Sequence, residues 1–239
     1  MFIEDIDREI IYNTQCKLDV INISSTEKTA QNLEDVKAKL SLKYQNFLDV
    51  FDWVQADKLS SHHSYDYKIK LTSDATSSCC QAYWMSFYKL QKVKKYLNEN
   101  FFKEFITFSK ASYFSSVLFI LKANKDLRFC VDYRKLNAII KRNHYSLSLI
   151  NEIINKIVDC KHLTQLNIIL TFNKLRMHSD SKNYTTFIIA LKAYKSKILF
   201  FELINDLISF QQYMNDVLWD FLNDFCQVYL DNILIYSKT

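Results

Sequence analysis

The amino-acid sequence predicts an α+β fold. Stretches with the periodicity of strands and stretches with the periodicity of helices follow one another in mixed order, without the regular strand–helix–strand alternation of a parallel sheet. Hydrophobic residues make up 49% of the 239 positions, which is enough to bury a core. The chain contains no Gly and no Pro. These residues normally mark turns and helix ends, so the elements must be located from periodicity alone.

The first half of the chain passes from a polar stretch to apolar elements. Residues 1–43 mix acidic and basic side chains with weak helical periodicity, and we interpret them as a linker or tail. Residues 87–101 predict a helix, because apolar side chains recur there every three or four positions. Residues 116–122 and 127–132 are strand-like and predict a β-hairpin.

The second half predicts two helices, a strand and a closing hairpin. Apolar residues between 150 and 158 form a clean helical stripe, and residues 163–170 are typical of a buried strand. A second long helix is predicted over 210–222. Residues 226–236 predict a β-hairpin about Asp231 and Asn232. Short connections favour placing this hairpin beside 163–170 in one antiparallel sheet, with the second helix packed on it.

The composition records mutation at the nucleotide level. Lys outnumbers Arg 26 to 5, and Gly and Pro are missing altogether. The scarce or missing residues, Arg, Gly and Pro, are all encoded by GC-rich codons. The formal charge of +5 would ordinarily indicate an anionic partner. Here the charge is weak support, because Asp→Asn and Glu→Lys changes raise it without selection for binding.

The cysteines and the N-terminus indicate an intracellular protein. The six cysteines show no CxxC pair and no framework spacing, which favours scattered thiols in a reducing compartment. The first residues, MFIEDIDREIIYN, contain acids and no apolar core of a signal peptide. No apolar run approaches the 18 residues of a membrane span. We therefore expect neither a signal peptide nor a membrane segment.

Four stretches follow one another in fixed order: LRFCVDYRKLNAII, LTQLNIILTFNKLRM, LINDLISFQQYMNDVL and VYLDNILIYSKT. Together they resemble the fingers and palm of reverse transcriptases from gypsy-class long-terminal-repeat retrotransposons. Upstream, YQNFLDVF and SYDYKIKL resemble the segment that connects to the polymerase in those polyproteins. The resemblance implies a connecting segment and the start of the fingers over 44–115. It implies fingers and palm over 116–239, with an antiparallel palm sheet packed by helices, and the thumb absent.

The resemblance also implies a damaged metal site. The family holds two Mg²⁺ ions with an Asp in an LDL string and an Asp pair in YLDD, because Mg²⁺ prefers anionic oxygen ligands. Asn167 stands at the first of these positions, Asp231 at the second and Asn232 at the third. Asp231 is thus the remaining metal ligand among the three catalytic positions. Losing two of three charges predicts weakened Mg²⁺ binding and no catalysis.

Five further positions correspond to the nucleotide site of the family. Phe172 matches an aromatic that excludes a ribose 2′-hydroxyl, or else it is a core residue. Arg128 and Lys122 match contacts to the incoming triphosphate, or else they are surface charges. Glu202 replaces a Gly where the backbone approaches template and nucleotide, so it obstructs and repels phosphates unless it points to solvent. Gln211 matches the family string TFQ near the template.

Three functional hypotheses follow from these residues. The leading one is an RNA-directed DNA polymerase fragment of a retrotransposon, a nucleotidyltransferase by descent that is now an inactive pseudoenzyme. Its partners would be an RNA/DNA template–primer and dNTPs, with Mg²⁺ as the family cofactor. The second is a non-catalytic nucleic-acid-binding remnant that uses the basic fingers. The third is a translated relic without function.

The departures from the family share a direction that the coding DNA can test. PLPLI is here SLSLI, and MPFGLTNAP is here LFFELINDL. The Pro→Ser, Pro→Leu, Pro→Phe, Gly→Glu and Asp→Asn replacements all arise from C-to-T changes on one strand or the other. We expect transitions to outnumber transversions greatly when the coding DNA is aligned with sibling copies. Equal numbers would refute this origin.

Overall fold

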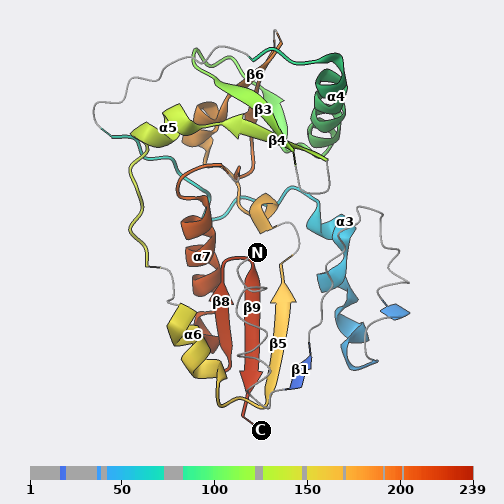
Figure 1. Ribbon diagram of the computed structural model, residues 1–239, viewed down its shortest axis with the longest axis vertical. Helices are drawn as coiled ribbons and strands as arrows, with labels where there is room; N and C mark the ends of the chain where they lie inside the picture. The colour runs from blue at the N-terminus through green and yellow to red at the C-terminus, as the bar shows by residue number, and fades with distance from the viewer. Residues whose placement is uncertain are drawn as a thin grey trace. The chain divides into compact units, whose positions relative to one another are not determined.

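Two β-sheets organise the chain, one in each of two structural units (Figure 1). The computed structural model describes residues 17–19, 37–38, 42–72, 83–121, 126–146, 150–168, 171–190, 192–200 and 202–238. Unit 1 comprises residues 1–53, 145–169 and 210–239, and unit 2 comprises 54–144 and 170–209. The sequence boundaries proposed at residues 43 and 115 remain a prediction.

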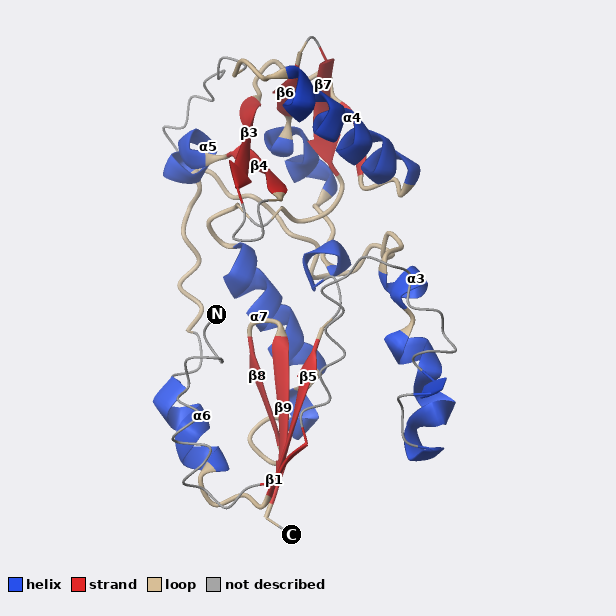
Figure 2. Ribbon diagram, turned by 45° about the vertical axis from the view of Figure 1, so that its right-hand side comes forward, coloured by secondary structure: helices blue, strands red, loops and turns tan. Residues whose placement is uncertain are grey.

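The sheet of unit 1 has the strand order β1-β5-β9-β8. Strand β5 (His162–Asn167) pairs antiparallel with β9 (Asn232–Ser237), which pairs antiparallel with β8 (Cys226–Tyr229). The predicted neighbourhood of residues 163–170 and 226–236 is therefore confirmed (Figure 2). The prediction of a buried strand is wrong, because within β5 only Leu163 is buried. Polar side chains stand on both faces of β5, because Gln165 and Asn167 share the face of Leu163 while His162 and Thr164 lie on the other.

Part of the predicted linker lies in this sheet. Strand β1 (Lys17–Asp19) pairs in parallel with His162–Thr164 of β5. Most of residues 1–43 lies outside the described residues. A ten-residue 3-10 segment, η1 (Leu42–Phe51), follows it. The sequence missed β1 because a three-residue edge strand carries too few side chains to show a period.

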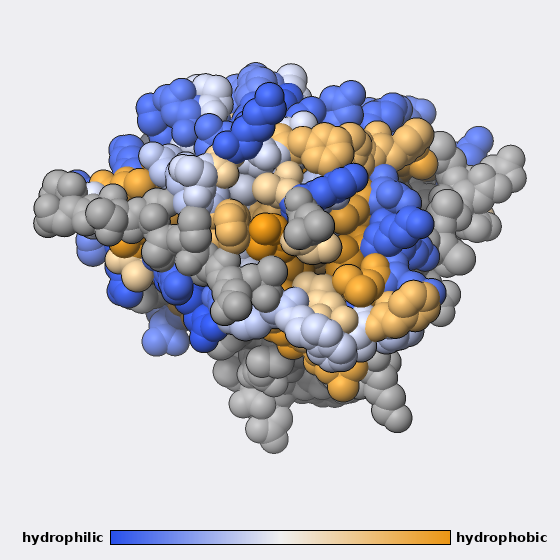
Figure 3. All heavy atoms as spheres, turned by 90° about the horizontal axis from the view of Figure 1, so that it is seen from above, coloured by the Kyte–Doolittle hydropathy of each residue, from blue (hydrophilic) through white to orange (hydrophobic). Residues whose placement is uncertain are grey.

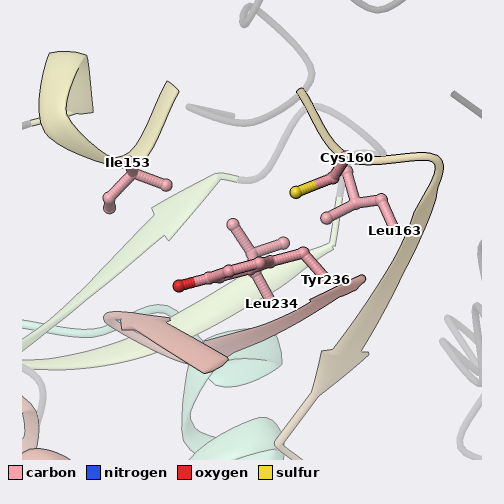
Figure 4. Close-up of a cluster of buried hydrophobic side chains, with 5 residues drawn as sticks. All are labelled: Ile153, Cys160, Leu163, Leu234 and Tyr236. Carbon is pink, nitrogen blue, oxygen red and sulfur yellow. The ribbon is translucent and has the colours of Figure 1, made fainter. Parts of the chain in front are cut away.

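A small apolar cluster supports the sheet of unit 1 (Figure 4). Helix α6 (Ile150–Ile157) contributes buried Ile153, which confirms the predicted helical stripe. Its partners are Cys160, Leu163, Leu234 and Tyr236, with Ile157 and Tyr229 packed at the margin. Leu163 and Tyr236 are register partners in β5 and β9. The cluster thus fixes which residues of the two strands lie opposite each other.

The predicted long helix over 210–222 is split in the structure. Helix α7 (Asp206–Val217) begins four residues earlier and ends before a separate 3-10 turn, η4 (Trp219–Phe221). Leu218 caps this turn with a non-helical backbone. The apolar pattern continues across the break, so periodicity alone gave one helix.

The sheet of unit 2 has the strand order β2-β7-β6-β3-β4. Strands β3 (Ser115–Leu121) and β4 (Leu127–Asp132) form the predicted antiparallel hairpin. Residues 122–125, which join them, lie outside the described residues. Strands β2 (Ile106–Phe108), β7 (Lys192–Ser196) and β6 (Phe187–Ile189) complete the sheet. Unit 2 also contains α5 (Arg134–Ile139), η2 (Thr171–Lys174), η3 (Ser179–Thr185) and most of α3 (Trp53–Ala56).

Helix α4 (Phe87–Phe102) of unit 2 confirms the helix predicted over 87–101. Val93 is buried, and Tyr96 stacks on Phe129 of β4 with ring centroids 3.9 Å apart. Leu90, which the sequence placed on the buried face together with Val93 and Leu97, is 40% exposed. Among the described residues, no helix has the length and apolar character needed to cross a bilayer.

The absence of Gly forces other residues into left-handed backbone conformations. Glu104, Ala190, Asn223 and Leu230 have φ values of 58°, 51°, 68° and 54°. Gly adopts this region without steric cost, whereas an L-residue crowds its Cβ against the following carbonyl. Each position therefore stores local strain in a turn.

Ala190 offers a direct test of this strain. It is exposed and follows β6, so Ala190→Gly removes only a strained Cβ. The relieved strain of about 1–2 kcal/mol outweighs the added chain entropy of about 0.5–1 kcal/mol. We expect a stability gain of about 0.5–1 kcal/mol by urea unfolding.

Ala193→Gly in β7 is the matched control, since residue 193 lies in regular strand. It should lose about 0.5–1 kcal/mol, as Gly does within an element. A stability loss in Ala190→Gly equal to the control would show that the turn is not strained.

Candidate functional site

The structure brings the three predicted catalytic positions together at one end of the unit 1 sheet. Asn167 is the last residue of β5, and its register partner is Asn232, the first residue of β9. Asp231 precedes Asn232, and its carbonyl accepts a hydrogen bond from the Ile168 amide at 2.9 Å. The predicted closeness of Asn167 and Asp231 is confirmed, because Asn167 lies opposite Asn232 and the residue after it, Ile168, bonds Asp231.

The turn of this hairpin lies one residue earlier than the sequence indicated. Asn232 already pairs with Tyr229 across the hairpin, so Leu230 and Asp231 form the turn. Leu230 takes the left-handed conformation that a tight hairpin demands at a turn position. The sequence pointed to Asn232 because Asn tolerates that conformation better than Leu. The prediction that the turn centres on Asp231 and Asn232 is therefore wrong.

A chain of side-chain hydrogen bonds joins the candidate site. Asn232 Nδ2 donates to Asp231 Oδ1 at 3.0 Å. Asn232 Oδ1 accepts from Gln165 Nε2 at 2.7 Å and from Asn167 Nδ2 at 3.5 Å. Sequence reasoning missed Gln165. The signal was available, because residues 165 and 167 of one strand face the same side.

These residues do not fit a site for two Mg²⁺ ions. Mg²⁺ takes hard oxygen ligands, preferably carboxylates, in near-octahedral geometry. Here Asp231 supplies one carboxylate, and one of its oxygens already accepts a hydrogen bond from Asn232. The carbonyl oxygen of Asn232 is likewise occupied by amide donors. Over the whole described part of the chain, no group of three His, Cys, Asp or Glu residues could hold a metal ion.

Gln211 holds the hairpin in place from helix α7. Its side chain is 0% exposed, and its Nε2 donates to the Val228 carbonyl at 3.0 Å and to Asn215 Oδ1 at 2.8 Å. Its Oε1 accepts from the Leu230 amide at 2.7 Å. Both ends of the amide are therefore bonded within the chain, and a role of Gln211 near template or nucleotide remains a prediction. Gln211 positions the turn that carries Asp231.

Glu202 of unit 2 is a half-buried acid. Burial raises the pKa of its carboxyl group, while a hydrogen bond with the Cys130 thiol and the charge of Arg128 lower it. Burial, together with Glu202, also raises the pKa of Cys130 to about 11. The Glu202 carbonyl accepts from Asn137 Nδ2 at 2.8 Å. The alternative that Glu202 simply points to solvent is wrong, because its carboxylate meets a buried thiol.

The remaining predicted positions are located as follows. Arg128 is an exposed residue of β4 and lies close enough to Glu202 to act on its titration. Phe172 belongs to η2. Lys122 lies outside the described residues. Their roles at a nucleotide remain predictions.

A second acid of unit 2 is more deeply buried than Glu202. Asp206 is 5% exposed, and its Oδ2 has no hydrogen-bond partner among the described residues. Burial raises the pKa of its carboxyl group to about 7, with a further contribution from the charge of Glu202. Burial away from water disfavours the charged form of a carboxyl group. Glu202 and Asp206 thus sit where burial disfavours negative charge.

Replacing Gln211 tests its positioning role. Gln211→Met keeps the volume but leaves the Leu230 amide and the Val228 carbonyl without their partner. Each buried group left unsatisfied costs about 1–3 kcal/mol, so unfolding by urea should show a loss of at least about 2 kcal/mol. Gln212→Met, at the half-buried neighbouring position, is the control and should change stability by less than about 0.5 kcal/mol. Equal effects would contradict the role assigned to Gln211.

Comparisons with known proteins place this geometry in a family. Residues 120–239 match the family model described as reverse transcriptase (RNA-dependent DNA polymerase). The chain is 35% identical over 117 residues to the retrovirus-related Pol polyprotein from transposon 297 of Drosophila melanogaster, covering 49% of the chain and 11% of the polyprotein. It is 25% identical over 225 residues to the transposon Tf2-7 polyprotein of Schizosaccharomyces pombe, covering 92% of the chain and 17% of the polyprotein. The chain thus spans less than a fifth of either polyprotein.

Solved structures show the same fold. Prototype foamy virus protease–reverse transcriptase superposes with a TM-score of 0.64 at 21% identity, covering 87% of this chain and 29% of that one. The foamy viral protease–reverse transcriptase in complex with RNA/DNA hybrid gives a TM-score of 0.68 at 15% identity, with the same coverage. The predicted α+β architecture of fingers and palm is confirmed. Since the matching family model covers half of its residues, the chain belongs to the reverse transcriptase (RNA-dependent DNA polymerase) family.

Proposed function

We propose that this chain is the fingers-and-palm part of a gypsy-class retrotransposon reverse transcriptase and that it does not polymerise DNA. Its likeness to two transposon polyproteins supports the retrotransposon origin. The foamy viral relative binds an RNA/DNA hybrid, so the partner proposed here is an RNA/DNA template–primer, with dNTP as the substrate of the ancestral reaction. No membrane partner is proposed.

The single observation that carries the inactivity is the donor set around Asp231. Asn167 and Asn232 have the reach of Asp but no charge, and their amides are engaged with each other and with Gln165. Removing one preorganised electrostatic group commonly costs about 10²–10³ in rate. Two such losses at the metal site remove the field that would hold Mg²⁺ and stabilise the phosphoryl charge.

The nucleotide side of the family pattern is also compromised. Glu202 lies beside Arg128, the cation predicted to meet the triphosphate. A carboxylate in that position offsets the charge of the guanidinium and repels phosphate oxygens. Negative charge is therefore missing at the metal site, where the reaction needs it, and present near Arg128, where the reaction needs positive charge.

Restoring the carboxylates tests the proposal. Asn167→Asp with Asn232→Asp places three acids at adjacent strand ends, where they repel one another until a cation binds. Mg²⁺ should then raise the Tm of the double variant, by roughly 2–4 °C for each kcal/mol of binding free energy. The unmodified chain should show no such shift.

The control carries the same charge change at exposed sites. Asn98→Asp with Asn155→Asp changes exposed residues of α4 and α6, neither of which is bonded to the side chains around Asp231, and should not respond to Mg²⁺. Because Glu202 remains in the restored variant, we expect no templated nucleotide incorporation from either variant on a primed RNA template. Incorporation by the unmodified chain would overturn the inactive assignment.

A further inference from the structure

Helix α4 packs only one of its sides against the sheet of unit 2. Val93 is buried and Tyr96 is stacked on Phe129, so this side anchors the helix to the sheet. With 3.6 residues per turn, two residues lie on the side of the helix opposite Val93. They are Tyr88, five positions before it, and Lys95, two positions after it. Both are exposed. The helix therefore presents a complete second face to solvent.

Large aromatic side chains lie exposed in the first turn of α4 and just before it. Trp84 is 89% exposed, Phe87 76% and Tyr88 59%. Exposed aromatic residues grouped in this way commonly mark an interaction site, whereas single exposed apolar residues need no explanation. We name the α4 outer face as the set Trp84, Phe87, Tyr88, Lys92, Lys94 and Lys95.

Cations lie among these rings. The Lys92 ammonium sits 5.6 Å from the centroid of the Tyr88 ring. Lys94 is exposed, and Lys95 is exposed with its ammonium 3.9 Å from a Glu99 oxygen. With one acid against three lysines, the α4 outer face attracts anions. On the face of the molecule seen in Figure 3, apolar residues border directly on hydrophilic ones.

Aromatic rings interleaved with cations match the chemistry of a single nucleic-acid strand. Unstacked bases lie flat on aromatic side chains while lysines meet the phosphates. A duplex keeps its bases inside and offers only the phosphates. A helix that lies on a membrane has a continuous apolar face separate from its charges, whereas Lys95 here lies on the same side of the helix as Tyr88. Charge and ring placement thus favour single strands.

We propose that the α4 outer face binds single-stranded RNA or DNA. This site goes beyond the proposed function, since it uses none of the residues around Asp231. The bases of the bound strand stack on Trp84, Phe87 or Tyr88. The phosphates of the strand contact Lys92, Lys94 and Lys95.

The test measures binding of the full chain to a fluorescein-labelled oligothymidylate by fluorescence anisotropy over a range of salt concentrations. Trp84→Ala with Tyr88→Ala should weaken binding about tenfold or more, given the usual contribution of base stacking. Lys92→Gln with Lys95→Gln should reduce the slope of log affinity against log salt by about 1.4, because each phosphate of a single strand contributes about 0.7. All four side chains are exposed, so the variants should fold.

Trp219→Ala with Phe221→Ala is the matched control, because these exposed aromatic residues lie in η4 of unit 1. It should leave oligothymidylate affinity within twofold of the unmodified chain. An RNA/DNA hybrid is titrated in parallel, and the Trp84→Ala, Tyr88→Ala variant should bind it within twofold of the unmodified chain.

Three results would overturn the inference. They are no binding of oligothymidylate by the unmodified chain, an equal loss in the control variant, and binding to anionic lipid vesicles in place of the oligonucleotide. None of them bears on the proposed function, whose tests are the Mg²⁺ response at Asp231 and nucleotide incorporation. Loss of hybrid binding alone would count against the proposed template–primer partner and leave the α4 outer face in place.

Discussion

The antiparallel register of β5 on β9 is the constraint on which the candidate site depends. Leu163 opposite Tyr236 sets this register within the apolar cluster, and the same register brings Asn167 opposite Asn232. A slip of one residue would turn every side chain of the strand to the other face. Gln211 adds a second restraint by bonding the turn from α7. The scaffold that aims the catalytic positions is therefore intact.

The end of this sheet carries amides beside a single carboxylate. Carboxylates grouped to hold a cation repel one another without it, whereas amides satisfy each other directly. Asn232 accepts from Gln165 and donates to Asp231, so the end of the sheet is internally bonded. In unit 2 the acids Glu202 and Asp206 are partly or fully withdrawn from water. Under the proposed function, fold and catalysis have separated here, because packing depends on apolar residues and catalysis depends on a few charges.

Most of the regular structure followed from periodicity in the sequence. Helices α4 and α6 and the hairpins β3–β4 and β8–β9 were predictable, because their apolar side chains recur with the period of the element. Strand β1 and the end of α7 were not, since one is too short and the other breaks within a continuous apolar pattern. The turn at Leu230 was missed because this chain has no Gly, so a Leu takes the left-handed conformation that Leu normally disfavours.

The candidate site was predictable in position and less so in its bonding. The strand motifs located Asn167, Asp231 and Asn232, whose neighbourhood depends only on strand order and register. The roles of Gln165 and Gln211 depend on which side chains meet across elements, which no local pattern encodes. The burial of Glu202 against Cys130 likewise arises from tertiary packing.

A crystal structure of the chain grown with Mn²⁺ would show whether the donors around Asp231 hold a metal ion, because the anomalous signal of Mn²⁺ locates the ion unambiguously. We expect no ordered ion at Asp231 and an intact hydrogen bond between the side chains of Gln165 and Asn232. An Mn²⁺ ion bridging Asp231 and a reoriented Asn167 or Asn232 would contradict this expectation, since the remaining donors would then suffice to build the metal site.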